Sequence, residues 1–175
     1  MEKEIKVSFD SFDLNFQTEI ELSTELENEL EVSLRLLGQV FSDYLANDLG
    51  IPAHPFDLNF SLVGDEEIRS INRDHRNKDK ITDVLSFPMQ ESFRNKEYDS
   101  FMPLIEIGDL LICHSVCGKQ AKEFNLTYME EFIHLAIHGF LHLCGFDHEV
   151  SDEEERLMEA EEKKLILRVS ALKNI

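Results

Sequence analysis

The chain has 175 residues and carries 17 Lys and Arg against 36 Asp and Glu, which gives a formal net charge of −19 at pH 7. This length supports one good hydrophobic core and is too short for two ordinary domains, so we expect a single domain over residues 1–175. The charge argues against a protein that binds nucleic acid through its overall charge, because phosphate contacts need a positive surface. Any RNA therefore needs a local basic patch, and no DNA partner is expected.

The cysteines and the N-terminus indicate the cellular compartment. Cys113, Cys117 and Cys144 are odd in number and lie in apolar segments, which fits a reducing compartment better than a disulfide framework. We expect them to be small buried side chains rather than metal thiolates. The N-terminus lacks the basic start and apolar core of a signal peptide, and no stretch approaches membrane-spanning length. We therefore expect a cytoplasmic protein with no membrane partner.

The first third of the chain predicts strands and one long helix. Apolar and polar residues alternate over residues 5–9, 12–16 and 56–62, which predicts three strands. Thr24 and Glu27 form a capping box before a long amphipathic helix, whose leucine stripe continues until Gly50. Asp65 can then cap a short helix with Ile68 on its inner side.

The chain becomes basic after this short helix. The densest positive patch of the acidic protein consists of Arg73, His75, Arg76, Lys78 and Lys80. Such a cluster is usually a solvated face. Here it stands just before a predicted strand over residues 82–87, closed by Pro88, and this fixed scaffold favours anion recognition. These residues alone are consistent with either role.

The second half of the chain predicts a buried helix. We expect an irregular loop over residues 89–104, a candidate lid over a cleft, and then a strand over residues 105–112. Ser115 can begin the next helix, and Thr127 with Glu130 forms a second capping box. The helix behind this box is apolar on nearly every face apart from a histidine stripe, so we expect it to lie at the centre of the domain.

A last acidic helix completes the predicted elements. Ser151 caps it, and its acidic run is expected to be solvated surface. Its predicted inner side consists of Leu157, Met158, Leu165 and Val169.

Three histidines on and after the buried helix form a candidate metal site. His138 and His142 are four residues apart, which on a helix puts both imidazoles on one face about 6 Å apart along the axis. Gly145 stands where the helix would end in a left-handed residue, so the turn lets His148 reach the same point. Three neutral imidazoles leave one position of a tetrahedral Zn²⁺ free, which is typical of a catalytic site. Hydrolysis is thus the leading class of reaction.

The residues beside these ligands narrow the chemistry. The histidine spacing matches the ligand frame of the metzincin proteases, but their general-base Glu is replaced here by Gly139. This departure argues against peptidase chemistry, and the missing side chain leaves room for substrate to approach the helix backbone. His134 lies about 12 Å of helix rise from His142, so we expect it to support the site or the core rather than bind the ion.

Strands and helices do not alternate strictly, which indicates the α+β class. We expect a single domain in which helices cover a small mixed β-sheet around a central buried metal-binding helix, a zincin-like arrangement. The metal would then lie at the edge of a cleft.

Two segments resemble a known family. Residues 138–148, His-Gly-Phe-Leu-His-Leu-Cys-Gly-Phe-Asp-His, resemble the His-Gly-x-Leu-His-Leu-x-Gly-Tyr-Asp-His signature of the YbeY endoribonucleases, the bacterial rRNA maturation factors. Residues 72–88 are similar to its Asn-x-x-x-Arg segment followed by Thr-Asp-Val-Leu-Ser-Phe-Pro, and residues 107–110 to its Gly-Asp strand. The resemblance covers residues 56–166. Phe146 replaces a usual Tyr, Ile81 a common Pro and His75 a frequent Tyr, and none of these changes removes a proposed ligand.

The resemblance implies a single-strand-specific, zinc-dependent endoribonuclease domain that acts in 16S rRNA 3′-end maturation and ribosome quality control. One Zn²⁺ would be held by His138, His142 and His148. Arg76 is expected to bind or stabilise the scissile phosphate, because a guanidinium is a permanent, bidentate phosphate partner. Arg73 and Lys78 would help to hold the RNA. The expected partners are rRNA and ribosomal or small-subunit assembly proteins.

The general base and two other functions stay open. Candidate bases are Asp83, Asp109, Asp147 and hydroxide bound to the metal, although each carboxylate can instead orient a ligand imidazole, the role preferred for Asp147. One alternative function is a ribosome-associated assembly factor with a mainly structural metal, which the acidic charge favours slightly. The other is a metallohydrolase of another substrate class.

Overall fold

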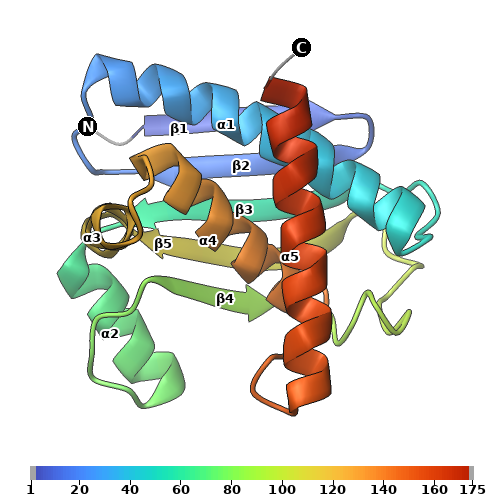
Figure 1. The fold of residues 1–175 in the computed structure, drawn as a ribbon. Coiled ribbons are helices and arrows are strands. Elements are labelled where there is room, and N and C mark those ends of the chain that lie inside the picture. Colours follow the sequence, from blue (N-terminus) through green and yellow to red (C-terminus); the bar gives the residue numbers. More distant parts are fainter. Residues whose placement is uncertain (1–2, 174–175) are drawn as a thin grey trace.

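The computed structural model describes residues 3–173, which form one mixed five-stranded sheet in the order β1-β2-β3-β5-β4 (Figure 1). The strands are β1 Lys3–Phe9, β2 Phe12–Thr18, β3 Phe56–Val63, β4 Val84–Pro88 and β5 Ile105–Cys113. The edge strands β1 and β4 run antiparallel to their neighbours, whereas β2, β3 and β5 are parallel to one another. The predicted α+β class is confirmed.

Helices cover one face of this sheet in two layers, and the short helix over residues 65–76 packs on the opposite face. The helices are α1 Thr24–Asp43, the π-helix η1 Tyr44–Asp48, α2 Asp65–Arg76, α3 His114–Phe124, α4 Tyr128–Leu143 and α5 Asp152–Lys173. α1 packs on β1 and β2, and α4 packs on β4 and β5. α5 crosses in front of both helices (Figure 1), so α4 is enclosed between the sheet and α5. The prediction of a central, buried helix is therefore confirmed.

Alternating side chains explain why this face of the sheet is covered. Phe12, Leu14 and Phe16 of β2 are buried on the helical side, as are alternate residues of β3. Phe60 of β3 stacks on Phe132 of α4 with ring centroids 5.2 Å apart. Burying each such side chain contributes roughly 1.5–3 kcal/mol, so the alternation sets which face α4 occupies.

Helix caps agree with the sequence in part. Thr127 and Glu130 form the predicted capping box of α4, with both of its hydrogen bonds present. α1 begins differently, because the cap is Ser23, whose Oγ accepts a hydrogen bond of 3.2 Å from the Leu26 N–H. Thr24, the predicted cap, is already inside the helix. Similarly, α2 follows Gly64 and α3 follows Cys113, each one or two residues before the predicted capping residue.

The buried side of α5 differs at one predicted position. Met158, Leu165 and Val169 are buried, whereas Leu157 is 41% exposed. Successive helix residues lie about 100° apart around the axis, and a crossing helix buries only a narrow stripe.

All three cysteines are buried and free. Within residues 3–173, no helix combines the length and apolar character that a membrane span requires.

Candidate metal centre

The three predicted ligands come together where α4 ends. His138 and His142 face each other one turn apart, with 3.2 Å between their Nε2 atoms. The ring of His148 lies 5.2 Å from that of His138 and 5.1 Å from that of His142, measured between centroids. One nitrogen from each imidazole lies within 4.8 Å of the other two. This arrangement of three imidazoles can hold a metal ion.

A glycine turn brings the third imidazole to the helix. Gly145 has a φ of +98°, a conformation that glycine adopts without the steric cost of a Cβ. Its N–H donates to the carbonyl of His142 over 3.0 Å, and the Phe146 N–H donates to the carbonyl of Leu141 over 3.1 Å. These bonds close the end of α4 and reverse the chain, as predicted. His148 thereby reaches the ligands on the helix.

Two acceptors orient the helical imidazoles. His138 Nδ1 lies 2.6 Å from Oε1 of Glu162 on α5, and His142 Nδ1 lies 2.9 Å from the carbonyl oxygen of Phe146. If each Nδ1 donates its proton to that acceptor, each Nε2 presents its lone pair to the other ligands, as a metal requires. The donor set and its tautomers therefore fit a metal centre.

Glu162 is a candidate site residue that the sequence patterns did not indicate. The sequence predicted solvated surface for the acidic run of α5, yet the Glu162 side chain is only 16% exposed. It lies 24 residues after His138, and only the crossing of α5 over α4 brings the two together. No local spacing could have indicated this contact.

The surroundings keep the ligand His142 neutral. Burial lowers the pKa of His142 below its usual value, and the nearby His138 and His148 lower it further. Burial alone would raise the pKa of Glu162, but the hydrogen bond and charge of His138 outweigh it and the net shift is downward. A neutral His142 and an ionised Glu162 at neutral pH are the forms that favour metal binding.

Replacing Glu162 with Ala is expected to weaken metal binding about tenfold or more, because loss of an acceptor behind a ligand frees its ring to rotate. Titration against a colorimetric chelator measures this affinity. Glu159→Ala is the matched control, since Glu159 is on the same helix but pairs only with Lys163, over 3.8 Å. Equal affinities in the two variants would contradict an orienting role for Glu162.

The ligands open onto a cavity of about 580 Å³ that also contains part of the basic patch. Arg76, Lys78 and Lys80 line it together with the three histidines. Nη2 of Arg76 donates to the carbonyl of Ser86 over 2.9 Å, which fixes the guanidinium at the cavity wall. Arg73 does not line this cavity, because its side chain turns to Asp74 and Ser70. One side of the cavity therefore combines imidazoles with fixed positive charge.

The predicted carboxylates differ in position. Asp109 lies on the opposite face of the sheet, in a larger cavity of about 950 Å³ that contains none of the three ligands, and it accepts from Asn59. It is therefore removed as a candidate base. Asp83 lines the metal cavity, but Gln120, Thr82 and the Val84 N–H all donate to its carboxylate. Burial raises the pKa of Asp83, and these hydrogen bonds more than offset that effect and lower it.

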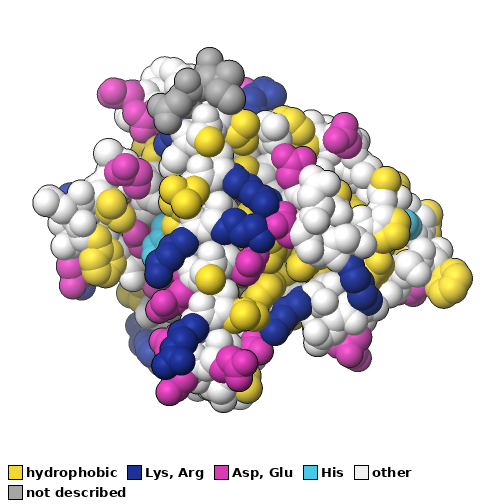
Figure 2. Space-filling view, turned by 45° about the vertical axis from the view of Figure 1, so that its right-hand side comes forward, with side chains coloured by type: hydrophobic (Ala, Val, Ile, Leu, Met, Phe, Trp, Pro, Cys, Tyr) yellow, Lys and Arg dark blue, Asp and Glu magenta, His cyan; other side chains and the backbone are white. Residues whose placement is uncertain are grey.

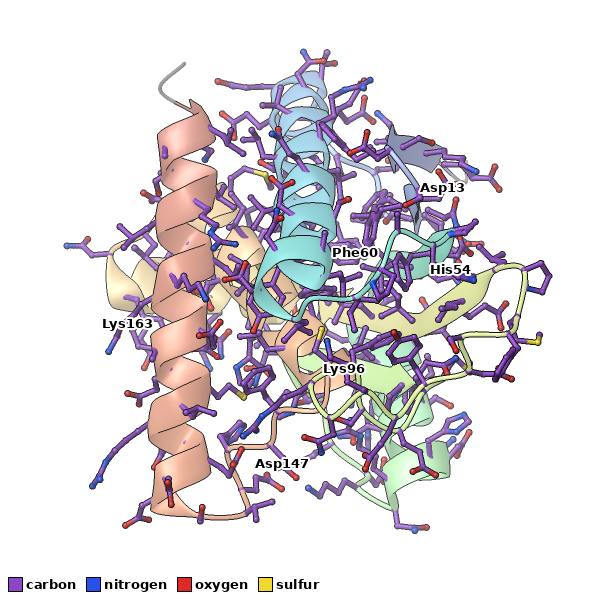
Figure 3. The ribbon with its side chains drawn as sticks, turned by 90° about the vertical axis from the view of Figure 1, so that its right-hand side faces the viewer. Asp13, His54, Phe60, Lys96, Asp147 and Lys163 are labelled. Atoms are coloured by element: carbon purple, nitrogen blue, oxygen red, sulfur yellow. The ribbon has the colours of Figure 1, made fainter. Side chains whose placement is uncertain are left out.

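Asp147 also lines the cavity, and it is exposed on the turn after α4 (Figure 3). Its Oδ1 accepts from the Glu149 N–H over 2.9 Å rather than from a ligand imidazole. The preferred role of Asp147 as an orienting group is thus taken by Glu162 and by the Phe146 carbonyl.

Gly139 and His134 also differ from expectation. A Cβ on Gly139 would overlap Cδ1 of Leu110 and lie 3.2 Å from Cγ2 of Val84, so the missing side chain allows α4 to approach the sheet and does not admit substrate. His134 is 41% exposed and lies 3.5 Å from the buried carboxylate of Glu131, so it is not a core residue.

Positive charge elsewhere is largely neutralised. On the face that includes α5, Lys and Arg side chains are interspersed with Asp and Glu (Figure 2). Arg168 and Lys164 both contact Asp48, and Arg94 pairs with Glu154. Arg76, Lys78 and Lys80 form a basic wall of the metal cavity, which is also lined by the carboxylates of Asp83, Glu91, Asp147 and Glu149.

Known proteins are similar to this chain in sequence and in fold. The family described as "Endoribonuclease YbeY" matches residues 15–170. Endoribonuclease YbeY of Finegoldia magna is 33% identical over 92% of this chain and 90% of its own length. That of Leptospira interrogans is 42% identical over 63% of this chain and 84% of its own length. The solution structure of TM1509 from Thermotoga maritima has a TM-score of 0.57 and 27% identity, covering 91% of each chain.

Proposed function

Because the chain belongs to the YbeY endoribonuclease family, we propose that it is a zinc-dependent endoribonuclease that cleaves single-stranded RNA. The observation that carries this proposal is one cavity in which three imidazoles lie beside Arg76, Lys78 and Lys80. An ion at the imidazoles and a phosphate at the cations would be neighbours there. Metal-assisted hydrolysis of a phosphodiester uses an arrangement of this kind.

Zinc is the metal that this donor set favours. Neutral imidazoles suit Zn²⁺, and a site with three protein ligands keeps a position for water or substrate. His138, His142 and His148 would hold the ion through nitrogen, with Glu162 and the Phe146 carbonyl orienting two of the rings. When bound, the zinc would activate water and polarise a phosphodiester oxygen.

The remaining cavity residues have separate tasks in this proposal. Arg76, fixed by the Ser86 carbonyl, has further N–H groups with which to bind the scissile phosphate and stabilise charge that develops on it. Lys78 and Lys80 bind the neighbouring phosphates of the RNA, and Arg73 binds the RNA outside the cavity. Of the three candidate bases Asp83, Asp109 and Asp147, Asp147 is the one that is both exposed and in the cavity, so it is the proposed proton acceptor.

We further propose that the RNA is rRNA. A role in 16S rRNA 3′-end maturation and ribosome quality control, in the cytoplasm, is proposed because residues 72–88 and 138–148 resemble the segments of the bacterial rRNA maturation factors. The net charge of −19 would repel free RNA, whereas ribosomal or small-subunit assembly proteins could hold the RNA against the basic wall. Partners of this kind fit an acidic nuclease.

Metal removal tests the enzymatic proposal. We expect purified protein to contain about one zinc per chain and to cleave a single-stranded RNA faster than the matching duplex. A chelator should stop cleavage, and added zinc should restore it. If the chelator lowers the melting temperature and no RNA turnover is seen with or without metal, the protein is instead an assembly factor with a structural metal. Zinc-dependent cleavage of peptides or small esters, with RNA intact, would identify another metallohydrolase.

A further inference from the structure

The turn that carries His148 is held by a hairpin from the predicted lid. We call residues 144–148 the ligand turn. Within the loop over residues 89–104, Ser92 and Glu97 form a short hairpin through backbone hydrogen bonds of 3.0 and 2.7 Å. This part of the loop packs against the ligand turn and the core.

The hairpin is anchored in the hydrophobic core. Phe93 is fully buried and stacks on Tyr98, with ring centroids 5.3 Å apart, and its edge meets Phe56. Lys96 donates to the carbonyl of Leu49 beyond α1, and Figure 3 shows Lys96 on the same side of the molecule as Asp147 of the ligand turn. Because both flanks are fixed, the residue between them, Arg94, has a defined position.

Arg94 and Ser92 contact the ligand turn at three successive residues. The Arg94 N–H donates to the Cys144 carbonyl over 2.9 Å. Ser92 lies so close to Gly145 that a Cβ there would overlap its Oγ. The Arg94 guanidinium lies over the Phe146 ring, with its central carbon 4.7 Å from the ring centroid. This contact uses the ring face and requires no phenolic hydroxyl.

An ion pair fixes the Arg94 guanidinium itself. Its Nη1 and Nη2 donate to the two carboxylate oxygens of Glu154 over 2.5 and 3.0 Å. Glu154 lies in the first turn of α5, and Ser151 Oγ caps that helix by accepting from the Glu154 N–H. Arg94 thus joins the ligand turn to the start of the helix that follows it.

We propose, on the basis of the proposed metal centre, that Arg94 is a positioning residue for two ligands of that centre, His142 and His148. The Phe146 carbonyl orients His142, and His148 follows Phe146 by two residues without the support of a helix. By holding the Phe146 ring against the hairpin, Arg94 places both imidazoles before the metal arrives. Preorganised ligands bind a metal more tightly, because less freedom is lost on binding.

Metal affinity in the absence of RNA tests this role. In competition with a colorimetric chelator, Arg94→Ala should bind Zn²⁺ about tenfold more weakly than the unchanged protein. Arg168→Ala is the matched control, since Arg168 also makes a bidentate pair, with Asp48 over 2.5 and 2.9 Å, but on α5 away from the ligand turn. It should lower thermal stability similarly and keep the zinc affinity within about twofold. Cobalt-loaded Arg94→Ala should also show a shifted visible spectrum.

The outcomes separate this inference from the proposed function. Equal zinc affinities and equal cobalt spectra in Arg94→Ala and Arg168→Ala would overturn it. If Arg94→Ala does not fold, Arg94→Lys is measured instead, because Lys keeps the charge but cannot combine the planar stack with a bidentate pair. Arg94→Lys should still bind zinc more weakly than Arg168→Ala, and an equal affinity would overturn the inference. If Arg94→Ala shows the expected loss of zinc affinity but the unchanged, zinc-loaded protein cleaves no RNA, the nuclease function alone is refuted.

Discussion

Replacing His142 with Ala is expected to remove the bound metal and to slow RNA cleavage by at least about 10³-fold. His142 is adjacent to both other candidate ligands, with its Nε2 3.2 Å from that of His138 and its ring centroid 5.1 Å from that of His148. The two rings that remain belong to different segments, α4 and the turn after it, and offer too few donors for a stable site. Metal analysis of the purified variant and initial rates on a single-stranded RNA measure both effects.

The control for this variant lies on the same helix. His134→Ala removes a half-exposed imidazole whose nearest ion-pair partner is Glu131, so it should keep its metal and most of its activity. A His142→Ala protein that retains stoichiometric metal would show that the ion binds elsewhere. A variant that loses its metal and still cleaves RNA at the original rate would show that the metal is not catalytic.

Reversing the charge of Arg76 is expected to have the next largest effect. Arg76→Glu should reduce RNA cleavage about 10²-fold or more while leaving the metal content unchanged. The substitution removes N–H groups that bind the phosphate and places a negative charge at the cavity wall. Arg76→Lys should recover part of this loss, since it restores the charge but not the bidentate geometry. Single-turnover rates at saturating RNA separate the effect on chemistry from the effect on binding.

A second arginine of α2 supplies the comparison. Arg69 is 44% exposed and pairs with Asp79 over 2.8 Å, outside the metal cavity. Arg69→Glu introduces the same change of charge on the same helix and should alter cleavage by no more than about threefold, through long-range electrostatics. Similar losses in Arg76→Glu and Arg69→Glu would reduce the role of Arg76 to general attraction of RNA.

Local patterns explain which features were predictable. The alternation in β2 and β3 decides which side chains are buried, and the Thr127 capping box decides where α4 begins. The spacing of His138 and His142 and the glycine before His148 encode the ligands themselves, because helix geometry converts a four-residue interval into proximity. Each of these signals lies within a few residues, so no knowledge of the tertiary fold was needed.

Features that depend on packing were not predictable in the same way. Asp109 faces away from the metal because the pleat of β5 directs it to the other side of the sheet from Leu110, which contacts Gly139. Arg73 and Arg76 are three residues apart on α2, yet only Arg76 reaches the cavity. A sequence identifies a basic cluster, but the packing of α2 on the sheet decides that Arg76 reaches Ser86 and the metal cavity.

The sequence by itself determined the three candidate ligands, the buried helix that carries two of them and the α+β class. Only the tertiary structure decided what holds those ligands in place. Glu162 reaches His138 from α5, and Arg94 reaches Phe146 from a loop that precedes α4 by more than one secondary-structure element. Ligand spacing is a property of one helix, whereas support comes from separate segments whose contact is set by burial of the whole core.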